Sequence, residues 1–252
     1  MRVAGIPLVV HRSWYIIAGL ITWSLATGYF PLRYAGYPAP TYWIMGLTAA
    51  LLLFGCVLLH ELGHSIVARW YGIPVYRVTL FIFGGVAQIG REAHRPGVEL
   101  QVALAGPLVS VLLAAACLLG SAHLPAGRLF ADLALPILRY LAAINIGIIV
   151  FNLLPGFPLD GGRVLRAVLW LFTGSLRRAT RIASFFGMTL GIGLIVLGAW
   201  EMAVRGLWAG GFWWVILGSY LQSVAFATYR QSSPPPAGAG STQQTARSRS
   251  ID

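Results

Sequence analysis

The sequence predicts an all-α polytopic membrane protein with about six transmembrane helices and a short membrane-associated β-hairpin. Hydrophobic residues make up 58% of the 252 residues and charged residues only 10%, whereas a soluble domain carries about 25% charged residues. The mean hydropathy is +0.75. Six apolar runs are long enough to cross roughly 30 Å of hydrocarbon as helices, and they cover residues 14–30, 42–68, 98–120, 136–153, 182–200 and 211–228.

These runs indicate one membrane-embedded domain over residues 1–230, with its core at 40–170. The remaining segment, 231–252, consists mainly of Ser, Pro, Gly, Gln and Thr with two arginines. Such a composition buries too little apolar surface to fold, so it predicts a disordered cytoplasmic tail or linker.

The basic residues predict the orientation of the chain rather than a nucleic-acid partner. The formal net charge is +11, but the arginines lie between apolar runs and form no basic stripe on a polar helix. If the N-terminus is cytoplasmic, fourteen of the eighteen arginines fall in inner segments. This bias predicts a multi-pass protein of the lipid bilayer with both termini cytoplasmic. The oligomeric state stays open.

Residues 73–92 differ from the apolar runs around them. They are rich in β-branched and aromatic residues and are interrupted by Gly84 and Gly85. This pattern predicts a short hairpin rather than a helix. Its apolar character indicates that it dips into the membrane beside the helices, where non-helical backbone is tolerated only against protein or a wet cavity.

The second apolar run carries the motif His-Glu-Leu-Gly-His at residues 60–64. His60 and His64 are four residues apart, so on a helix they project from one face. Two imidazoles at this spacing can hold one zinc ion, and the adjacent Glu61 can act as a general base on a water. The alternative is a pair of buried histidines that join helices, next to a paired glutamate.

A third zinc ligand is expected, and Asp160 is the strongest candidate. Two prolines and three glycines within 155–162 break the fourth run near its inner end, and an unwound segment can turn a carboxylate towards a neighbouring helix. The alternative for Asp160 is a helix cap only. Cys56, one turn before His60, is a weaker candidate for the ligand.

The two motifs together resemble the site-2 protease family of intramembrane zinc metalloproteases. His-Glu-x-Gly-His is followed about a hundred residues later by Asn-x-x-Pro-x-x-Pro-Leu-Asp-Gly-Gly at residues 152–162, and Ala-Gly-Pro at 105–107 is similar to the family as well. The resemblance covers residues 40–170. It implies one zinc ion per chain, held by His60, His64 and Asp160, with Glu61 as general base and then general acid.

The resemblance also implies roles for residues around the metal. Asn152 is implied to hold the scissile region or to stabilise the oxyanion. Asn145, seven residues earlier, is expected on the same helix face, where it contacts substrate or hydrogen-bonds another helix. Gly84 and Gly85 are expected to shape a strand edge that binds an unwound substrate by β-augmentation; a structural plug is the alternative.

The implied function is intramembrane endopeptidase activity on a transmembrane protein substrate. His64 lies five residues before Arg69, which places the metal roughly 7–14 Å below the inner surface, near the cytoplasmic side of the bilayer. One alternative is a membrane metal-ion transporter with a His/Asp site, but a transporter predicts repeated halves and polar groups spread along a path. Another alternative is a catalytically inactive family member that only binds membrane proteins. The four residues needed for catalysis are nevertheless all present: His60, Glu61, His64 and Asp160.

Overall fold

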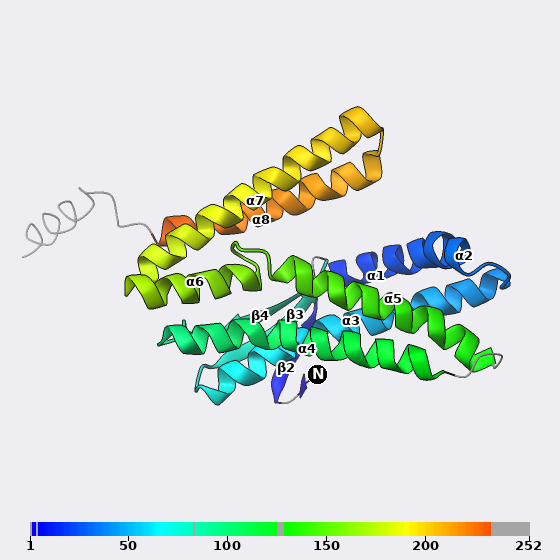
Figure 1. The fold of residues 1–252 in the computed structure, drawn as a ribbon, viewed down its shortest axis with the longest axis horizontal. Helices are drawn as coiled ribbons and strands as arrows, with labels where there is room; N and C mark the ends of the chain where they lie inside the picture. Colours follow the sequence, from blue (N-terminus) through cyan, green and yellow to red (C-terminus); the bar gives the residue numbers. More distant parts are fainter. Residues whose placement is uncertain (1, 4, 83, 125–128, 233–252) are drawn as a thin grey trace, which may run out of the picture.

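The computed structural model describes residues 2–3, 5–82, 84–124 and 129–232, so the predicted tail, 231–252, lies almost wholly outside the described residues. Helices dominate, with one small sheet (Figure 1). The elements are β1 Arg2–Val3, β2 Ile6–Val10, α1 Ser13–Ser24, the π-helical turn η1 Leu25–Tyr29, α2 Phe30–Arg33, α3 Ala39–Trp70, β3 Val75–Phe81, β4 Gly84–Ile89, α4 Pro96–His123, α5 Leu129–Asn152, α6 Asp160–Thr173, α7 Leu176–Arg205 and α8 Trp208–Gln231.

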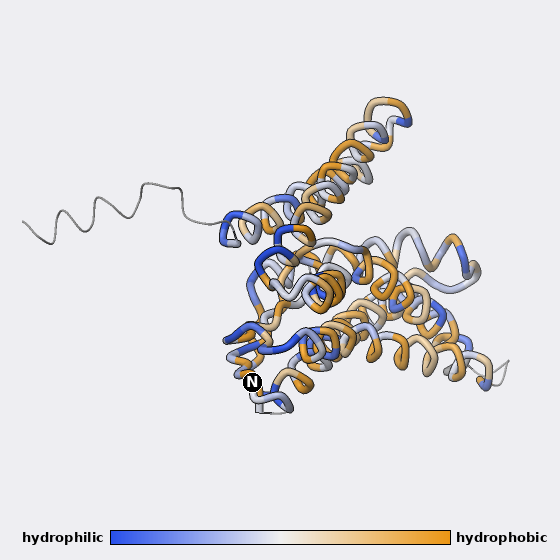
Figure 2. Tube along the Cα trace, turned by 60° about the vertical axis from the view of Figure 1, so that its left-hand side comes forward, coloured by the Kyte–Doolittle hydropathy of each residue, from blue (hydrophilic) through white to orange (hydrophobic). Residues whose placement is uncertain are grey.

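Five helical segments of the described chain are long and apolar enough to span a membrane, which makes this an integral multi-pass membrane protein. They are Ser13–Arg33, Ala39–Trp70, Pro96–His123, Asp132–Asn152 and Leu176–Arg205. The sixth expected run, 211–228, does form the long helix α8, but its Gly, Ser, Gln and Tyr residues keep α8 out of that set. Hydrophobic colouring follows the middle of the helices, and hydrophilic stretches gather near the sheet and at helix ends (Figure 2).

The predicted hairpin is present, and it belongs to a larger sheet than the sequence indicated. Strands β3 and β4 pair antiparallel, with Phe81 opposite Gly84 at the turn. The N-terminal strand β2 pairs parallel with β3, and β1 pairs antiparallel with β2, giving the order β1-β2-β3-β4. The run Ile-Pro-Leu-Val-Val at 6–10 is too short to reveal a pairing with residues about seventy positions away. Strand β4 is an edge of this sheet.

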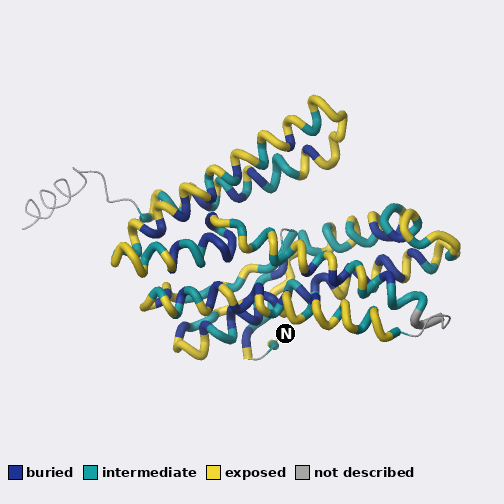
Figure 3. Tube along the Cα trace, in the orientation of Figure 1, coloured by how far each residue is buried: buried dark blue, intermediate teal, exposed yellow. Residues whose placement is uncertain are grey.

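The predicted break after the fourth run is confirmed, and a new helix, α6, follows it. Helix α5 ends at Asn152 and α6 begins at Asp160. Helix α6 packs against α4 on one side and α7 on the other. Buried stretches of α3, α4 and α6 face one another there (Figure 3). The non-helical segment between α5 and α6 therefore lies beside α3, the helix that carries His60 and His64.

Helices α7 and α8 form an antiparallel pair that stands apart from the bundle of α1, α3, α4 and α5 (Figure 1). Small residues let α7 and α8 pack closely, because a Cβ atom on Gly191 of α7 would lie 2.8 Å from the Gly218 carbonyl oxygen of α8. The pair touches the sheet where the rings of Phe81 and Tyr220 approach to 6.4 Å between centroids. Tyr220 and Leu221 of α8 line the same cavity as Pro158 and Leu159 in the break between α5 and α6.

Candidate metal centre

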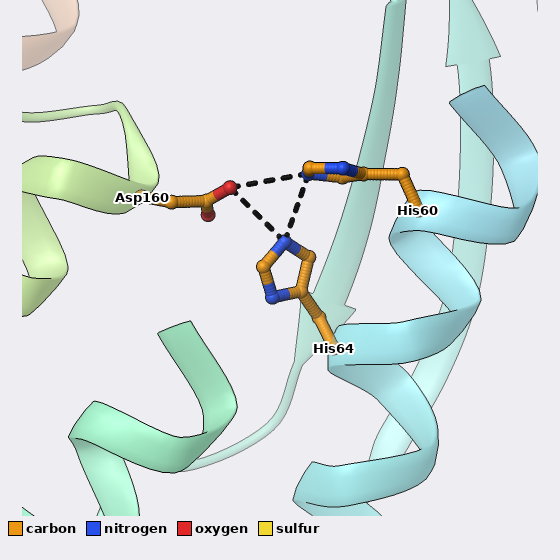
Figure 4. A group of neighbouring side chains, drawn as sticks. All are labelled: His60, His64 and Asp160. Carbon is orange, nitrogen blue, oxygen red and sulfur yellow. Dashed lines mark hydrogen bonds and ion pairs between the residues drawn. The ribbon is translucent and has the colours of Figure 1, made fainter. Parts of the chain in front are cut away.

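Three buried side chains from two helices converge on one point (Figure 4). His60 and His64 project from successive turns of α3, and their Nε2 atoms are 3.2 Å apart. Asp160 Oδ2 lies 3.1 Å from His60 Nε2 and 3.2 Å from His64 Nε2. Among the described residues, these three form the one group of His, Cys, Asp or Glu whose ligand atoms all lie within 4.8 Å of one another. Cys56 is buried but is not a member of it.

Each histidine is oriented through its other ring nitrogen. His64 Nδ1 is 2.7 Å from the Val102 carbonyl oxygen; since a carbonyl only accepts, Nδ1 donates its hydrogen and Nε2 keeps a free lone pair. His60 Nδ1 is 2.9 Å from Ser110 Oγ. Such partners fix the ring and tautomer of metal-binding histidines. Both Nε2 atoms are therefore presented as ligands to one position.

Asp160 is the first residue of α6, and it is not the cap of that helix. The N-cap position is occupied by Leu159, which makes no side-chain cap bond. The Asp160 carboxylate instead meets the two histidines. A charged carboxylate facing two imidazoles suits a cation.

The space in front of the ligand atoms fits a metal ion. A Cβ atom on Gly106 of α4 would lie 2.6 Å from His60 Nε2 and would also overlap His64 Nε2, so only glycine leaves this position free. Two imidazole nitrogens and a carboxylate oxygen are one of the donor sets of catalytic zinc sites, which keep a fourth position open. The residues present therefore fit zinc.

The metal centre opens into a cavity of about 460 Å³. Glu61, Asn152, Gly84 and Gly85 all line it, so the structure brings these four sequence-predicted residues to the three candidate ligands. Helix α8, which the sequence did not connect to the site, also contributes to the wall. Its contributing residues are Leu217, Tyr220 and Leu221.

Asn145 is placed differently from Asn152. It is fully buried, its Nδ2 donates to the Leu141 carbonyl oxygen at 2.8 Å, and it is not among the residues that line the cavity. Its Oδ1 has no hydrogen-bond partner among the described residues. Side chains seven positions apart on a straight helix drift by about 20°, and that drift takes Asn145 past the edge of the cavity wall.

The hairpin contacts the predicted general base directly. A Cβ atom on Gly85 would lie 2.5 Å from Glu61 Cγ, so the β4 backbone and the Glu61 side chain touch only because residue 85 is glycine. The Ala87 backbone of the same strand hydrogen-bonds the Glu61 carboxylate. Strand β4 thus determines where the Glu61 carboxylate sits in the cavity.

An ion-pair network attaches the start of α6 to α4. Glu99 of α4 is 1% exposed, and its Oε1 accepts from Arg163 Nε at 3.0 Å and from Arg166 Nη2 at 2.6 Å. Arg166 also pairs with Glu92 at 3.2 Å and lies over the Phe157 ring at 5.0 Å. Arg163 follows Asp160 by one helical turn, so this network sets the position of the third candidate ligand.

Replacing Glu99 with glutamine is expected to destabilise the protein by about 3–5 kcal/mol, because two arginines then lose their buried counter-charge. The network also anchors α6, so zinc should be lost faster to a chelator. Thermal denaturation in detergent and the rate of zinc loss measure the two effects. The matched control is Glu92→Gln: the Glu92 side chain is 65% exposed, and pairs with exposed carboxylates contribute about 0–1 kcal/mol. Equal effects of the two substitutions would contradict the anchoring role.

Sequence reasoning missed the residues of α4 that support the site. Val102, Gly106 and Ser110 follow one another at intervals of four, so they form a single helix face that meets the histidines. The signal available was the small-residue pattern around 103–107, which indicates only close helix packing. Nothing local in the sequence connects Glu99 with Arg163 and Arg166, which lie more than sixty residues away.

Comparison with known proteins supports the chemistry that this geometry suggests. The sequence matches the model described as peptidase family M50 over residues 48–134 and 120–194, which is more than half of the chain. A solved structure, the site-2 protease from Methanocaldococcus jannaschii, is similar with a TM-score of 0.56 and 26% identity, over 94% of this chain and 97% of that one.

Two curated relatives are named as zinc metalloproteases. Rip3 from Mycobacterium tuberculosis is 40% identical over 89% of this chain and 56% of its own length. A protein from Synechocystis is 38% identical over 90% of this chain and 58% of its own length. The present chain therefore spans a little over half the length of the curated relatives that it matches.

Proposed function

Because this chain belongs to peptidase family M50, the site-2 proteases, we propose that it is an intramembrane zinc endopeptidase that cleaves a transmembrane protein substrate within or next to its membrane segment. The observation that carries the proposal is the convergence of His60, His64 and Asp160 beside Glu61 in a cavity of a membrane-spanning bundle. The direct test is cleavage of a model single-span substrate by the purified chain, with loss of cleavage on chelation and recovery with zinc.

One zinc ion per chain is proposed, held by His60, His64 and Asp160. Zinc in such a site supplies Lewis acidity, which polarises the peptide carbonyl and acidifies water. Glu61 accepts the proton of the attacking water and then donates it to the leaving amine. Strand β4 holds Glu61 in place for both transfers through the contacts at Gly85 and Ala87.

Asn152 is proposed to bind the substrate beside the scissile bond. It lines the cavity at the last residue of α5, and its amide can donate to a carbonyl oxygen that gains negative charge during attack. Asn145 lies outside the cavity wall, so its part in the proposal is to support α5 rather than to touch substrate.

Strand β4 is proposed to receive the substrate as an added strand. A helical segment hides its peptide bonds in backbone hydrogen bonds and must unwind before cleavage. Strand β4 is a sheet edge, and Gly84, Gly85, Val86 and Ala87 line the cavity. An extended segment that pairs with this edge passes directly in front of Glu61.

Replacing Gly85 with alanine is expected to reduce cleavage by about 10²-fold, because the new Cβ atom displaces Glu61 and small misplacements of a catalytic group cost this much. Zinc content should stay normal, since Gly85 cannot ligate metal. The control is Gly55→Ala on α3, where a Cβ atom meets nothing within 4 Å. Loss of zinc together with loss of folding in Gly85→Ala would support a purely structural role for the hairpin.

Both termini are proposed to be cytoplasmic, with the active site near the cytoplasmic side of the bilayer. The support is the arginine distribution: with α8 as a sixth crossing and a cytoplasmic N-terminus, fourteen of the eighteen arginines fall in inner segments. Reporter fusions after residue 35 and after residue 230 test this orientation. We expect an external reporter at residue 35 and a cytoplasmic one at residue 230, and an external signal at residue 230 would contradict the proposal.

A further inference from the structure

A second cavity, which shares no lining residue with the cavity at the metal centre, lies where α7 begins and α8 ends. It is an open cavity of about 360 Å³ at the protein surface, and it is lined by Arg178, Arg181, Ile182, Phe185 and Tyr229. Arg177, Arg178 and Arg181 in the first turns of α7 precede its apolar stretch, a pattern typical of a helix end at the membrane surface. Nothing in the proposed proteolytic chemistry uses it.

The surroundings of this cavity are strongly positive. Arg178 and Arg181 line the cavity. Arg177 and Arg230 are the chain neighbours of the lining residues Arg178 and Tyr229, and all four arginines are exposed. The sequence has no Asp or Glu from residue 161 to 200, and α8 has none. Within the described part of the chain, these four arginines form no ion pair with a carboxylate: the recorded ion pairs involve other residues.

One of these arginines is already held in place. Arg181 Nη2 donates to Tyr229 Oη at 3.1 Å, and its guanidinium lies 5.3 Å from the centroid of the same ring. A guanidinium carries five N–H donors, so several remain available after this bond. Holding the side chain in advance reduces the entropy that an anion must overcome in ordering it.

Apolar side chains continue from the arginines towards the membrane. Ile182 and Phe185 are exposed, and they line the cavity together with Arg178 and Arg181 one turn before them. A soluble anion gains nothing from this apolar surface, whereas a lipid places its phosphate at the arginines and its acyl chain along it. The general excess of arginine on one side of the membrane explains the number of positive charges. It does not explain why arginines and apolar side chains line the same cavity.

We propose that the α7–α8 cavity binds an anionic phospholipid, with its phosphate on Arg178 and Arg181 and an acyl chain along Ile182 and Phe185. The expected selectivity is for a headgroup of net negative charge. Zwitterionic phosphatidylcholine carries a choline cation, which the neighbouring arginines Arg177 and Arg230 repel.

The experiment uses the full chain in detergent, with bound lipid counted by native mass spectrometry. The probes are dioleoyl phosphatidylglycerol, dioleoyl phosphatidylcholine with the same acyl chains, and sn-glycerol 3-phosphate, which has the phosphate without the chains. Phosphatidylglycerol should bind, phosphatidylcholine should bind much more weakly, and glycerol phosphate should fail to displace the bound lipid. Equal binding of the two lipids, or full displacement by glycerol phosphate, overturns the proposal.

Two double variants separate this cavity from general electrostatic attraction. Arg178→Gln with Arg181→Gln should weaken phosphatidylglycerol binding about thirty-fold, since each basic residue near an anionic lipid contributes about fivefold. Arg91→Gln with Arg95→Gln removes the same charge from exposed positions elsewhere and should leave binding unchanged. Equal weakening in both variants overturns the proposal. Thermal denaturation of each variant shows whether the helices stay folded, and the exposed positions predict that they do.

Discussion

Replacing Glu61 with glutamine is expected to abolish nearly all peptide cleavage while zinc stays bound. Glutamine keeps the size of the side chain and can still accept the hydrogen bond from the Ala87 backbone, but it cannot take a proton from water. Loss of general acid–base catalysis costs about 10²–10⁴-fold in rate. Zinc content is expected to be unchanged because the three candidate ligands are His60, His64 and Asp160.

The measurements are zinc stoichiometry and the rate of cleavage of a model membrane substrate in the same preparation. Glu201→Gln is a suitable control because Glu201 belongs to α7 and does not line the catalytic cavity. Glu61→Asp should retain part of the activity, since a shorter carboxylate still accepts a proton. Near-normal turnover in Glu61→Gln would remove Glu61 from the mechanism.

Replacing Asp160 with asparagine is expected to weaken zinc binding by more than about 100-fold and to reduce activity in parallel. Loss of a group that merely orients a ligand already costs about 10–100-fold in metal affinity, and the neutral amide supplies no negative charge to the dication. Folding should be nearly unaffected. Asparagine caps a helix as well as aspartate does, and Asp160 makes no capping bond in any case.

The measurement is zinc retention after a mild chelator challenge, together with thermal stability in detergent. His60→Ala removes a candidate ligand that α3 contributes, and it should lose zinc in the same way. Asp132→Asn makes the identical substitution on α5, away from the three ligands, and should retain zinc. If Asp160→Asn keeps all of its zinc and activity, Asp160 is not a ligand and another third ligand must exist.

The sequence alone indicated the features that depend on residues close together in the chain. The spacing of His60 and His64 places both on one helix face, the prolines and glycines of 155–162 end one helix and start another at Asp160, and Gly84 marks the hairpin turn. Each of these follows from helical periodicity or from backbone restrictions that act over a few residues. The N-terminal strands escaped detection because β2 pairs with a strand about seventy residues away.

Only the tertiary structure decided which faces of the helices meet around the metal centre. Gly106, Ser110 and the Val102 carbonyl approach the histidines because of the way α4 packs on α3, and Glu99 meets Arg163 and Arg166 because α6 packs on α4. Asn145 and Asn152 share a heptad position, yet a drift of about 20° leaves only Asn152 at the cavity. Sequence periodicity gives the face of each helix, but the rotation and depth at which two faces dock depend on the packing of all their side chains together.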